Sequence, residues 1–318
     1  MSIVGITFNW KVGSSSILLF ILLLPQAPIK TIPSENIHKE SPMKIYEYFI
    51  DLFQKEPVGT EFNAYKLLKE IPLDSEENYL AMPWVVLINS NKLDMIPDIN
   101  LNGGFTICQH IHFEKILPIL RKIGINVLFT PHAIKNKYYD GIKVLPFPHF
   151  AINGTKPAKH KDLWYSFVGF NTHPSRTTIF NMPKIENVII EERTNWHFYL
   201  SALEQEQAKL EYQDLLARSR FSLCPRGTGA STLRFWESLQ AGAIPILIAD
   251  EMTLPDGVDW KECIIQIAEK NVLDIHTILS KISPEKEKVM RNNCLKAYDF
   301  FSSENLVNNI RLYFATRE

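Results

Sequence analysis

The stretch "FSLCPRGTGASTLRFWESLQAGAIPILIAD", residues 221–250, decides the fold class of this chain. It contains a short apolar run, then Pro-Arg-Gly-x-Gly, then a helical pattern over 231–241, and then a second apolar run that ends at Asp250. Buried strands that alternate with helices are typical of a parallel sheet with helices on both faces. A glycine-rich turn between such a strand and a helix indicates a binding site for a phosphorylated ligand.

The same alternation continues through the rest of the chain. In the first half, apolar runs and periodic patterns predict strands at 44–49, 79–89, 105–111, 126–133 and 141–148, and helices at 61–69 and 113–123. In the second half they predict strands at 164–170, 186–192, 221–224, 244–250 and 263–268, and helices at 203–218, 231–241, 272–281, 285–301 and 304–314. We therefore expect an α/β protein with two Rossmann-like parallel sheets.

A polar, lysine-rich stretch, "NGTKPAKHKD" at 153–162, separates these two halves. Its composition is typical of a linker, so we expect a first domain over 43–155 and a second over 156–318. Ligands of parallel sheets bind at the carboxyl ends of the strands. Two such domains would therefore face each other across a ligand cleft.

The first 42 residues differ in composition from the rest. Their apolar run, 17–24, is shorter than the ~20 residues that a membrane helix needs. Lys11 before the run and Pro25 after it give it the proportions of a signal peptide or a weak membrane anchor. We expect a leader over 1–42 and a cytoplasmic or membrane-associated protein, peripherally attached if the leader is an anchor. The alternative, for a eukaryotic source, is the lumen of the Golgi or the endoplasmic reticulum.

The charge balance and the cysteines exclude several classes of protein. Lys and Arg number 34 against 35 Asp and Glu, a formal net charge of −1, which gives no general attraction for nucleic acid. The cysteines are far apart and form no Cys-x-x-Cys pair, so we expect free thiols rather than a zinc site or a disulfide framework. They are Cys108, Cys224, Cys263 and Cys294.

Two familiar phosphate motifs fit residues 221–250 poorly. A dinucleotide fingerprint would have a third glycine where Thr232 stands, and it would occupy the first strand–helix turn of its domain. An NAD-dependent oxidoreductase is therefore the less favoured alternative. A Walker loop would need Gly-Lys followed by Ser or Thr, which this stretch lacks.

The residues around the glycines predict a phosphate site of another kind. Gly227 and Gly229 would let the backbone approach a ligand and take positive φ. The helix that begins near Ser231 and Thr232 would direct its unpaired N–H groups at the ligand. Arg226, immediately before the glycines, could grip a diphosphate with two nitrogens of its guanidinium.

Two charged residues follow on the predicted helix. Glu237 lies about two turns along it, too deep for phosphate but able to accept hydrogen bonds from ribose hydroxyls. Arg234 would add a second cation to the site. The two residues are three positions apart, so an ordinary ion pair on the helix surface is the alternative interpretation.

Residues 219–260 closely resemble the exostosin family of glycosyltransferases (family 47). The family carries a CPRG-x-G loop, a helix with R-x-x-E-A-L-x-A-G, then I-P-V and a late D-W. Upstream, "YSFVGFNTHPSR" is similar to the family's F-x-G segment and its following arginine, which assigns Arg176 to the donor phosphates. The chain departs from the family at Thr228, Ser238 and Ala243, which concern packing and donor fit. It matches the main pattern at Cys224, Pro225, Arg226, Gly227, Gly229, Arg234, Glu237, Leu239, Ala241, Gly242, Pro245, Pro255, Asp259 and Trp260.

The resemblance implies a GT-B fold, with a nucleotide-sugar in the second domain and the acceptor on the first. The implied activity is metal-independent, inverting transfer of a sugar from a nucleotide-sugar, expected to be a UDP-sugar, to a glycan or other hydroxyl acceptor. No further cofactor is implied. The alternative function is a non-catalytic module that binds a nucleotide or nucleotide-sugar. The implied donor-binding residues are Arg176, Arg226, Gly227, Gly229, Ser231, Thr232, Arg234 and Glu237.

An inverting transfer needs a general base that deprotonates the acceptor hydroxyl. His132 in "FTPHA" and His149 in "PFPHF" directly follow apolar strands and are the candidate catalytic residues. His110 and His112 in "CQHIHF" are alternatives. Because buried histidines are often structural, the pattern alone does not separate the candidates.

Overall fold

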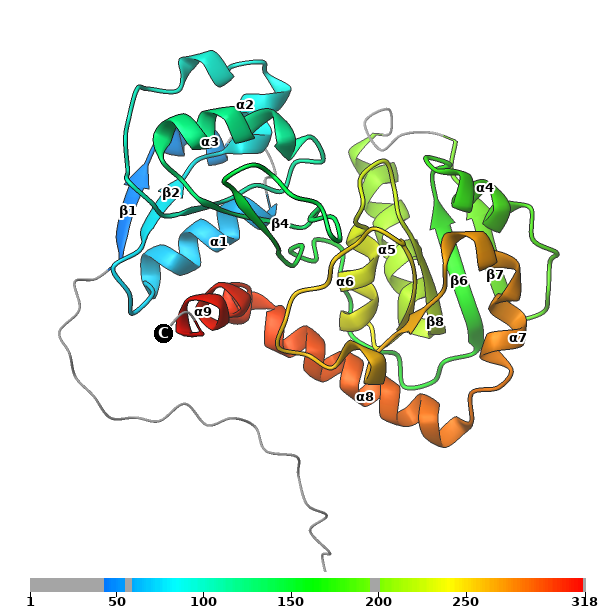
Figure 1. Ribbon diagram of the computed structural model, residues 1–318. Coiled ribbons are helices and arrows are strands. Elements are labelled where there is room, and N and C mark those ends of the chain that lie inside the picture. The colour runs from blue at the N-terminus through cyan, green and yellow to red at the C-terminus, as the bar shows by residue number, and fades with distance from the viewer. Residues whose placement is uncertain (1–42, 55–58, 195–200, 317–318) are drawn as a thin grey trace, which may run out of the picture. The chain divides into compact units, whose positions relative to one another are not determined.

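The first half of the chain forms a five-stranded parallel sheet. The computed structural model describes residues 43–54, 59–194 and 201–316, so the expected leader over 1–42 lies outside the described residues. The strand order is β1-β2-β3-β4-β5, and the parallel pairing brings the carboxyl ends of all five strands to one edge. Of these strands, β1, β2 and β4 are labelled in Figure 1. The strands are β1 (Lys44–Glu47), β2 (Asn78–Ala81), β3 (Phe105–Ile107), β4 (Val127–Thr130) and β5 (Lys143–Pro146).

Helices cover both faces of this sheet because its buried strands direct alternate side chains to opposite sides. Tyr79 and Phe105 pack with α1 (Gly59–Glu70). Leu80 and Leu128 pack instead with α2 (Trp84–Asn89) and α3 (Leu117–Ile123). The 3-10 helices of this half are η1 (Ile50–Gln54), η2 (Leu93–Met95) and η3 (Phe113–Ile116).

The second half forms another five-stranded parallel sheet, in the order β10-β9-β8-β6-β7. From β6 the chain runs outward to β7 and then returns across β6 to β8. The loops after β6 and β8 therefore diverge, and the carboxyl ends of these two strands form the switch point where parallel sheets bind ligands. The strands are β6 (Leu163–Gly169), β7 (Val188–Glu192), β8 (Ser219–Pro225), β9 (Ile244–Ile248) and β10 (Ile265–Gln266).

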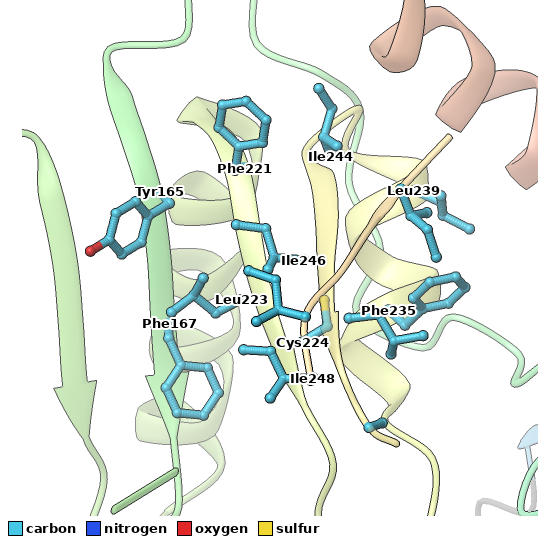
Figure 2. Close-up of a cluster of buried hydrophobic side chains, with 14 of the residues drawn as sticks. Tyr165, Phe167, Phe221, Leu223, Cys224, Phe235, Leu239, Ile244, Ile246 and Ile248 are labelled. Atoms are coloured by element: carbon cyan, nitrogen blue, oxygen red, sulfur yellow. The ribbon is translucent and has the colours of Figure 1, made fainter. Parts of the chain in front are cut away.

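The apolar side chains of β8 and β9 fill the core of this sheet. Phe235 and Leu239 share one cluster with Leu223 and Ile246 of the strands, on the side of α6 (Figure 2). Leu215 of α5 packs separately, with Leu163 and Val168. The helices are α4 (Pro174–Phe180), α5 (Ala202–Arg218), α6 (Leu233–Gln240), α7 (Ile275–Leu279) and α8 (Pro284–Phe301), with 3-10 helices η5 (Trp260–Glu262), η6 (Glu269–Asp274) and η7 (Ser303–Asn305).

The last helix, α9 (Asn308–Ala315), packs in the core of the first sheet, not the second. Its Phe314 ring centroid lies 5.2 Å from that of Phe105 and 6.4 Å from that of Phe129. The domain ranges 43–155 and 156–318 stay a prediction. The structure adds that this last helix, inside the second range, contributes to the core of the first sheet.

The expected α/β class with two parallel sheets is confirmed, but one predicted strand is wrong. The apolar run at 79–89 is β2 up to Ala81 and α2 from Trp84. Pro83 separates them, because it has no N–H to give to a strand ladder and instead precedes the first turn of α2. A continuous apolar run does not distinguish a buried strand from a buried helix by its period.

All four cysteines are buried and free, as predicted. Within residues 43–54, 59–194 and 201–316, no helix combines the length and the apolar composition that crossing a membrane requires.

Candidate functional site

A cavity of about 740 Å³ lies at the switch point of the second sheet. The second half of the chain contributes the loop after β6, helix α5, the glycine-rich loop and the first turns of α6 to its walls. The opposite wall comes from residues that follow β3, β4 and β5 of the first sheet: Gln109, Ile111, His132, His149 and Asn153. The cavity thus has the position that the two-sheet interpretation predicted for a ligand.

Most of the predicted site residues line this cavity. Arg226 does not: its Nη1 lies 2.6 Å from Glu251 Oε2, in an ion pair. His110 and His112 also lie outside the lining. The predicted residues that line it are His132, His149, Arg176, Gly227, Gly229, Ser231, Thr232, Arg234 and Glu237.

Arg176 joins the two loops that form the switch point. Its Nε donates to the carbonyl of Arg226 at 2.8 Å, Nη1 to that of Phe170 at 2.9 Å and Nη2 to that of Pro225 at 3.1 Å. Burial, together with the neighbouring charge of Arg234, lowers the pKa of Arg176 to about 10. No carboxylate of the described residues forms an ion pair with Arg176, so a cation faces the cavity without a counter-ion.

Arg234 is held between two aromatic rings. Its guanidinium carbon lies 4.9 Å from the ring centroids of both Phe167 and Tyr212, a cation–π arrangement on two sides. Its Nη2 donates to the carbonyl of Val168. Within the described part of the chain its Nη1 is buried without a hydrogen-bond partner.

Glu237 does not form the ion pair with Arg234 that was the alternative interpretation. Its Oε2 accepts from the Tyr212 hydroxyl at 2.5 Å, and its Oε1 accepts from the backbone N–H of Asn153 at 3.1 Å. The residue is only 3% exposed. Tyr212 therefore contacts both Arg234 and Glu237, and it takes the place of an ion pair between them.

Several buried polar atoms of the cavity wall lack a partner. Because buried polar groups are nearly always hydrogen-bonded, unpartnered groups gathered around one cavity indicate a polar ligand. With only residues 43–54, 59–194 and 201–316 considered, these atoms are His132 Nδ1, Thr172 Oγ1, Ser231 Oγ and Arg234 Nη1.

The glycine-rich loop differs from its expected conformation in one respect. Neither Gly227 nor Gly229 is among the glycines with positive φ, so that expectation is wrong. Gly229 is needed for another reason: a Cβ there would lie 2.6 Å from His132 Nδ1. The missing side chain lets the loop touch the histidine of the first sheet.

The N-terminus of α6 lies at the cavity and has no side-chain cap. The helix begins at Leu233, and the side chain of the N-cap residue Thr232 makes no capping hydrogen bond. Unpaired N–H groups at a helix N-terminus favour an anion. Ser231, Thr232, Leu233 and Arg234 all line the cavity at this point.

The two candidate bases are neighbours. The ring centroids of His132 and His149 are 5.4 Å apart. Burial lowers the pKa of His132 to about 4, while a hydrogen bond to the backbone of Gln109 partly opposes this. Among the described residues, His132 Nδ1 is buried without a hydrogen-bond partner, so it is the ring nitrogen available to a ligand. Burial also holds the pKa of His149 well below its usual range.

The residues of the wall that sequence reasoning missed include Tyr212, Thr172, Asn153 and Gln109. Gln109 and Thr172 carried a signal, because each follows closely after a strand whose carboxyl end lies at the site. Tyr212 carried none, since its helical pattern is that of an ordinary amphipathic helix.

No group of three or more His, Cys, Asp or Glu side chains within the described residues is placed to hold a metal ion. Metal independence stays a prediction.

Comparison with known families gives the same assignment as the motifs. The model of the Exostosin GT47 domain matches residues 124–282, half of the 318 residues. The chain belongs to the exostosin GT47 family. The match contains the glycine-rich loop, Arg176 and both candidate bases, whereas Gln109 lies before it.

Curated relatives align over parts of their length. The "Exostosin-1 homolog" of Caenorhabditis elegans is 36% identical over 98 residues, 30% of this chain and 26% of the relative. The "Probable glucuronoxylan glucuronosyltransferase IRX7" of Arabidopsis thaliana is 30% identical over 173 residues, 53% of this chain and 36% of the relative. The "Probable beta-1,4-xylosyltransferase IRX10" of the same plant is 35% identical over 91 residues, 27% of this chain and 22% of the relative. The chain spans well under half the length of each.

Solved structures are more distant. HepE of Anabaena, in complex with UDP and glucose, matches with a TM-score of 0.40 and 10% identity, over 86% of this chain and 84% of that one. The pneumococcal O-GlcNAc transferase GtfA, in complex with UDP and GlcNAc, matches with a TM-score of 0.39 and 10% identity, over 80% of this chain and 59% of that one.

Proposed function

We propose that this protein is a glycosyltransferase that moves a sugar from a UDP-sugar to a hydroxyl of a glycan acceptor. The observation that carries the proposal is the pair Arg176 and Arg234, two cations on one cavity wall without a carboxylate partner among the described residues. Burying a cation without a counter-ion is costly. A diphosphate would supply the missing negative charge and accept hydrogen bonds from both guanidinium groups.

The names of the relatives support sugar transfer as the reaction. One is called a glucuronosyltransferase and one a xylosyltransferase, both with the qualifier "probable". We infer that the donor carries a sugar of this general class and that the acceptor is a glycan. We also propose that residues 1–42 attach the protein to a membrane, which would follow from their apolar run.

The proposed reaction is a direct displacement at the anomeric carbon. His132 Nδ1 takes the proton of the acceptor hydroxyl as its oxygen forms a bond to that carbon. The bond from the anomeric carbon to the diphosphate oxygen breaks, and the diphosphate leaves with the electron pair. Arg176, Arg234 and the N–H groups at the start of α6 would stabilise the charge on the leaving group without a metal. One displacement inverts the configuration of the anomeric carbon.

Glu237 is proposed to bind the ribose of the donor. Each carboxylate oxygen has a second lone pair besides the one that Tyr212 or Asn153 uses. Glu237→Gln keeps the shape but loses the charge, and a hydrogen bond to a charged group is worth about 1.5–3 kcal/mol against about 0.5–1.5 kcal/mol for one between neutral groups. In calorimetric titration, wild type should bind UDP, and the variant should bind it about tenfold to a hundredfold more weakly.

The control ligand is 2′,3′-dideoxy-UDP. It should bind wild type weakly, and its affinity should be nearly the same for Glu237→Gln. The control variant is Glu211→Gln, on the exposed surface of α5 and outside the cavity, which should bind both ligands as wild type does. Equal losses of both ligands in Glu237→Gln would rule out a ribose contact. A wild type that binds no UDP would contradict the proposed function itself.

A further inference from the structure

The side chain of Gln109 is held in one orientation by the start of α1. Its Oε1 accepts from the backbone N–H of Thr60 at 2.6 Å and from that of Glu61 at 3.2 Å. These are N–H groups of the kind that a helix leaves unpaired at its N-terminus. In return, the backbone N–H of Gln109 donates to Glu61 Oε1 at 2.9 Å. Three hydrogen bonds therefore join the loop after β3 to α1.

These contacts decide which atom of the amide is the oxygen. With the amide reversed, its NH2 group would face two N–H donors, and neither contact would be a hydrogen bond. The NH2 group is thus fixed as the free end of the side chain. Gln109 is half-buried and lines the cavity, and no hydrogen bond of its Nε2 to another described residue is seen. The cavity wall therefore carries two oriented donor hydrogens.

The position of Gln109 links these donors to the acceptor side. It follows β3, next to β4, whose carboxyl end leads to His132. The backbone of Gln109 also forms the hydrogen bond with the His132 ring described above. The arginines come from the second sheet, whereas Gln109 and His132 both come from the first. An oxygen bound by Gln109 would therefore belong to the molecule whose hydroxyl His132 deprotonates.

We propose that the Gln109 amide selects the acceptor by donating a hydrogen bond to a sugar oxygen near the attacking hydroxyl. The inference rests on the proposed transferase function and adds a requirement to it. The acceptor must present a second oxygen that can accept, either a neighbouring hydroxyl or a carboxylate. Since a site that hydrogen-bonds a hydroxyl discriminates against the analogue without it, Gln109 would determine acceptor specificity.

The test compares Gln109→Met and Gln109→Glu with wild type in acceptor-dependent release of UDP. Methionine removes the donor, and glutamate keeps an oxygen for α1 but replaces the NH2 group with an acceptor. The acceptors are methyl xyloside, methyl glucoside and methyl glucuronide, together with their monodeoxy derivatives. Gln207→Met and Gln207→Glu, on the exposed surface of α5, are the matched controls. Thermal unfolding shows whether each variant is folded.

Both Gln109 variants should lose about tenfold to a hundredfold in kcat/KM on parent acceptors, because an acceptor oxygen would be buried without its donor. For one deoxy derivative, the one that lacks the contacted oxygen, wild type and variants should agree within about twofold. Equal losses on every parent and deoxy acceptor would overturn the inference and leave the transferase function standing. A wild type that releases no UDP with any acceptor would overturn both.

Discussion

Replacing His132 with glutamine is expected to lower kcat by about 10²–10⁴-fold, because that is the usual contribution of a general base. Glutamine has a similar volume and hydrogen-bonding capacity but cannot take the proton of the acceptor hydroxyl. His132 is the favoured base because, among the residues that the structure describes, its Nδ1 is buried at the cavity without a partner. Steady-state release of UDP, with the acceptor saturating, measures the effect.

The pH dependence of the rate gives an independent signature of His132. Burial holds its pKa at about 4, so in the free enzyme the ring is neutral at any pH well above that value. A loss of kcat/KM through its protonation is therefore expected only as the pH falls towards about 4. Bound diphosphate adds negative charge that favours the protonated ring. The acid limb of kcat should accordingly lie at higher pH than that of kcat/KM, and neither limb should persist in His132→Gln.

His149→Gln is the matched control for the base. His149 lies beside His132 but has no unpartnered ring nitrogen among the buried atoms described above. We expect it to reduce kcat by less than about tenfold. A larger loss in His149→Gln than in His132→Gln would transfer the role of base to His149.

Replacing Arg234 with methionine is expected to lower the affinity for UDP by at least about a hundredfold. The guanidinium would make two charge-assisted hydrogen bonds to the diphosphate, each worth about 1.5–3 kcal/mol. Transfer should decrease further, by about 10²–10³-fold in kcat, because the same group would stabilise the leaving diphosphate. Calorimetry with UDP and the rate of UDP release measure the two effects separately.

Two further variants test whether the planar guanidinium of Arg234 is required and whether Arg226 also binds the diphosphate. Arg234→Lys keeps the charge but loses the planar fork and its stacking on Phe167 and Tyr212, so it should restore only part of the affinity. Arg226→Met should cost less than Arg234→Met, because Arg226 lies outside the cavity wall and is paired with Glu251. From the sequence pattern alone, Arg226 was the residue expected to grip the diphosphate. A greater loss of UDP affinity in Arg226→Met than in Arg234→Met would support that expectation.

The strands, helices and turns that depend on a local sequence pattern could be predicted. The strand and helix periods of residues 221–250, and the Gly-x-Gly turn between them, predicted the central strands of the second sheet and the position of its phosphate loop. The helix predicted over 113–123 ends, as α3, at Ile123, where Gly124 follows with a left-handed φ of 87°. The error at 79–89 arose because a long apolar run is compatible with either a strand or a helix.

What the sequence did not predict depends on contacts between distant residues. Arg234 and Glu237 are three positions apart, and only Tyr212, 22 residues before Arg234 in the chain, gives each of them another partner. Gln109 is oriented by Thr60 and Glu61, almost 50 positions away. The packing of α9 on the first sheet joins the two ends of the described chain. Contacts between residues so far apart in the chain leave no periodic pattern in the sequence, so they could not be predicted from it.

The central claim is that the cavity binds a nucleotide-sugar and catalyses transfer of its sugar. The most direct measurement incubates wild type and Arg234→Met with UDP-glucuronate, UDP-xylose, UDP-glucose and UDP-N-acetylglucosamine, with and without glycan acceptors, and quantifies free UDP. We predict acceptor-dependent release from at least one donor by wild type and about a hundredfold less or none by the variant. Binding of UDP-sugars without acceptor-dependent release of UDP would contradict the account and identify a nucleotide-sugar-binding protein instead of a transferase.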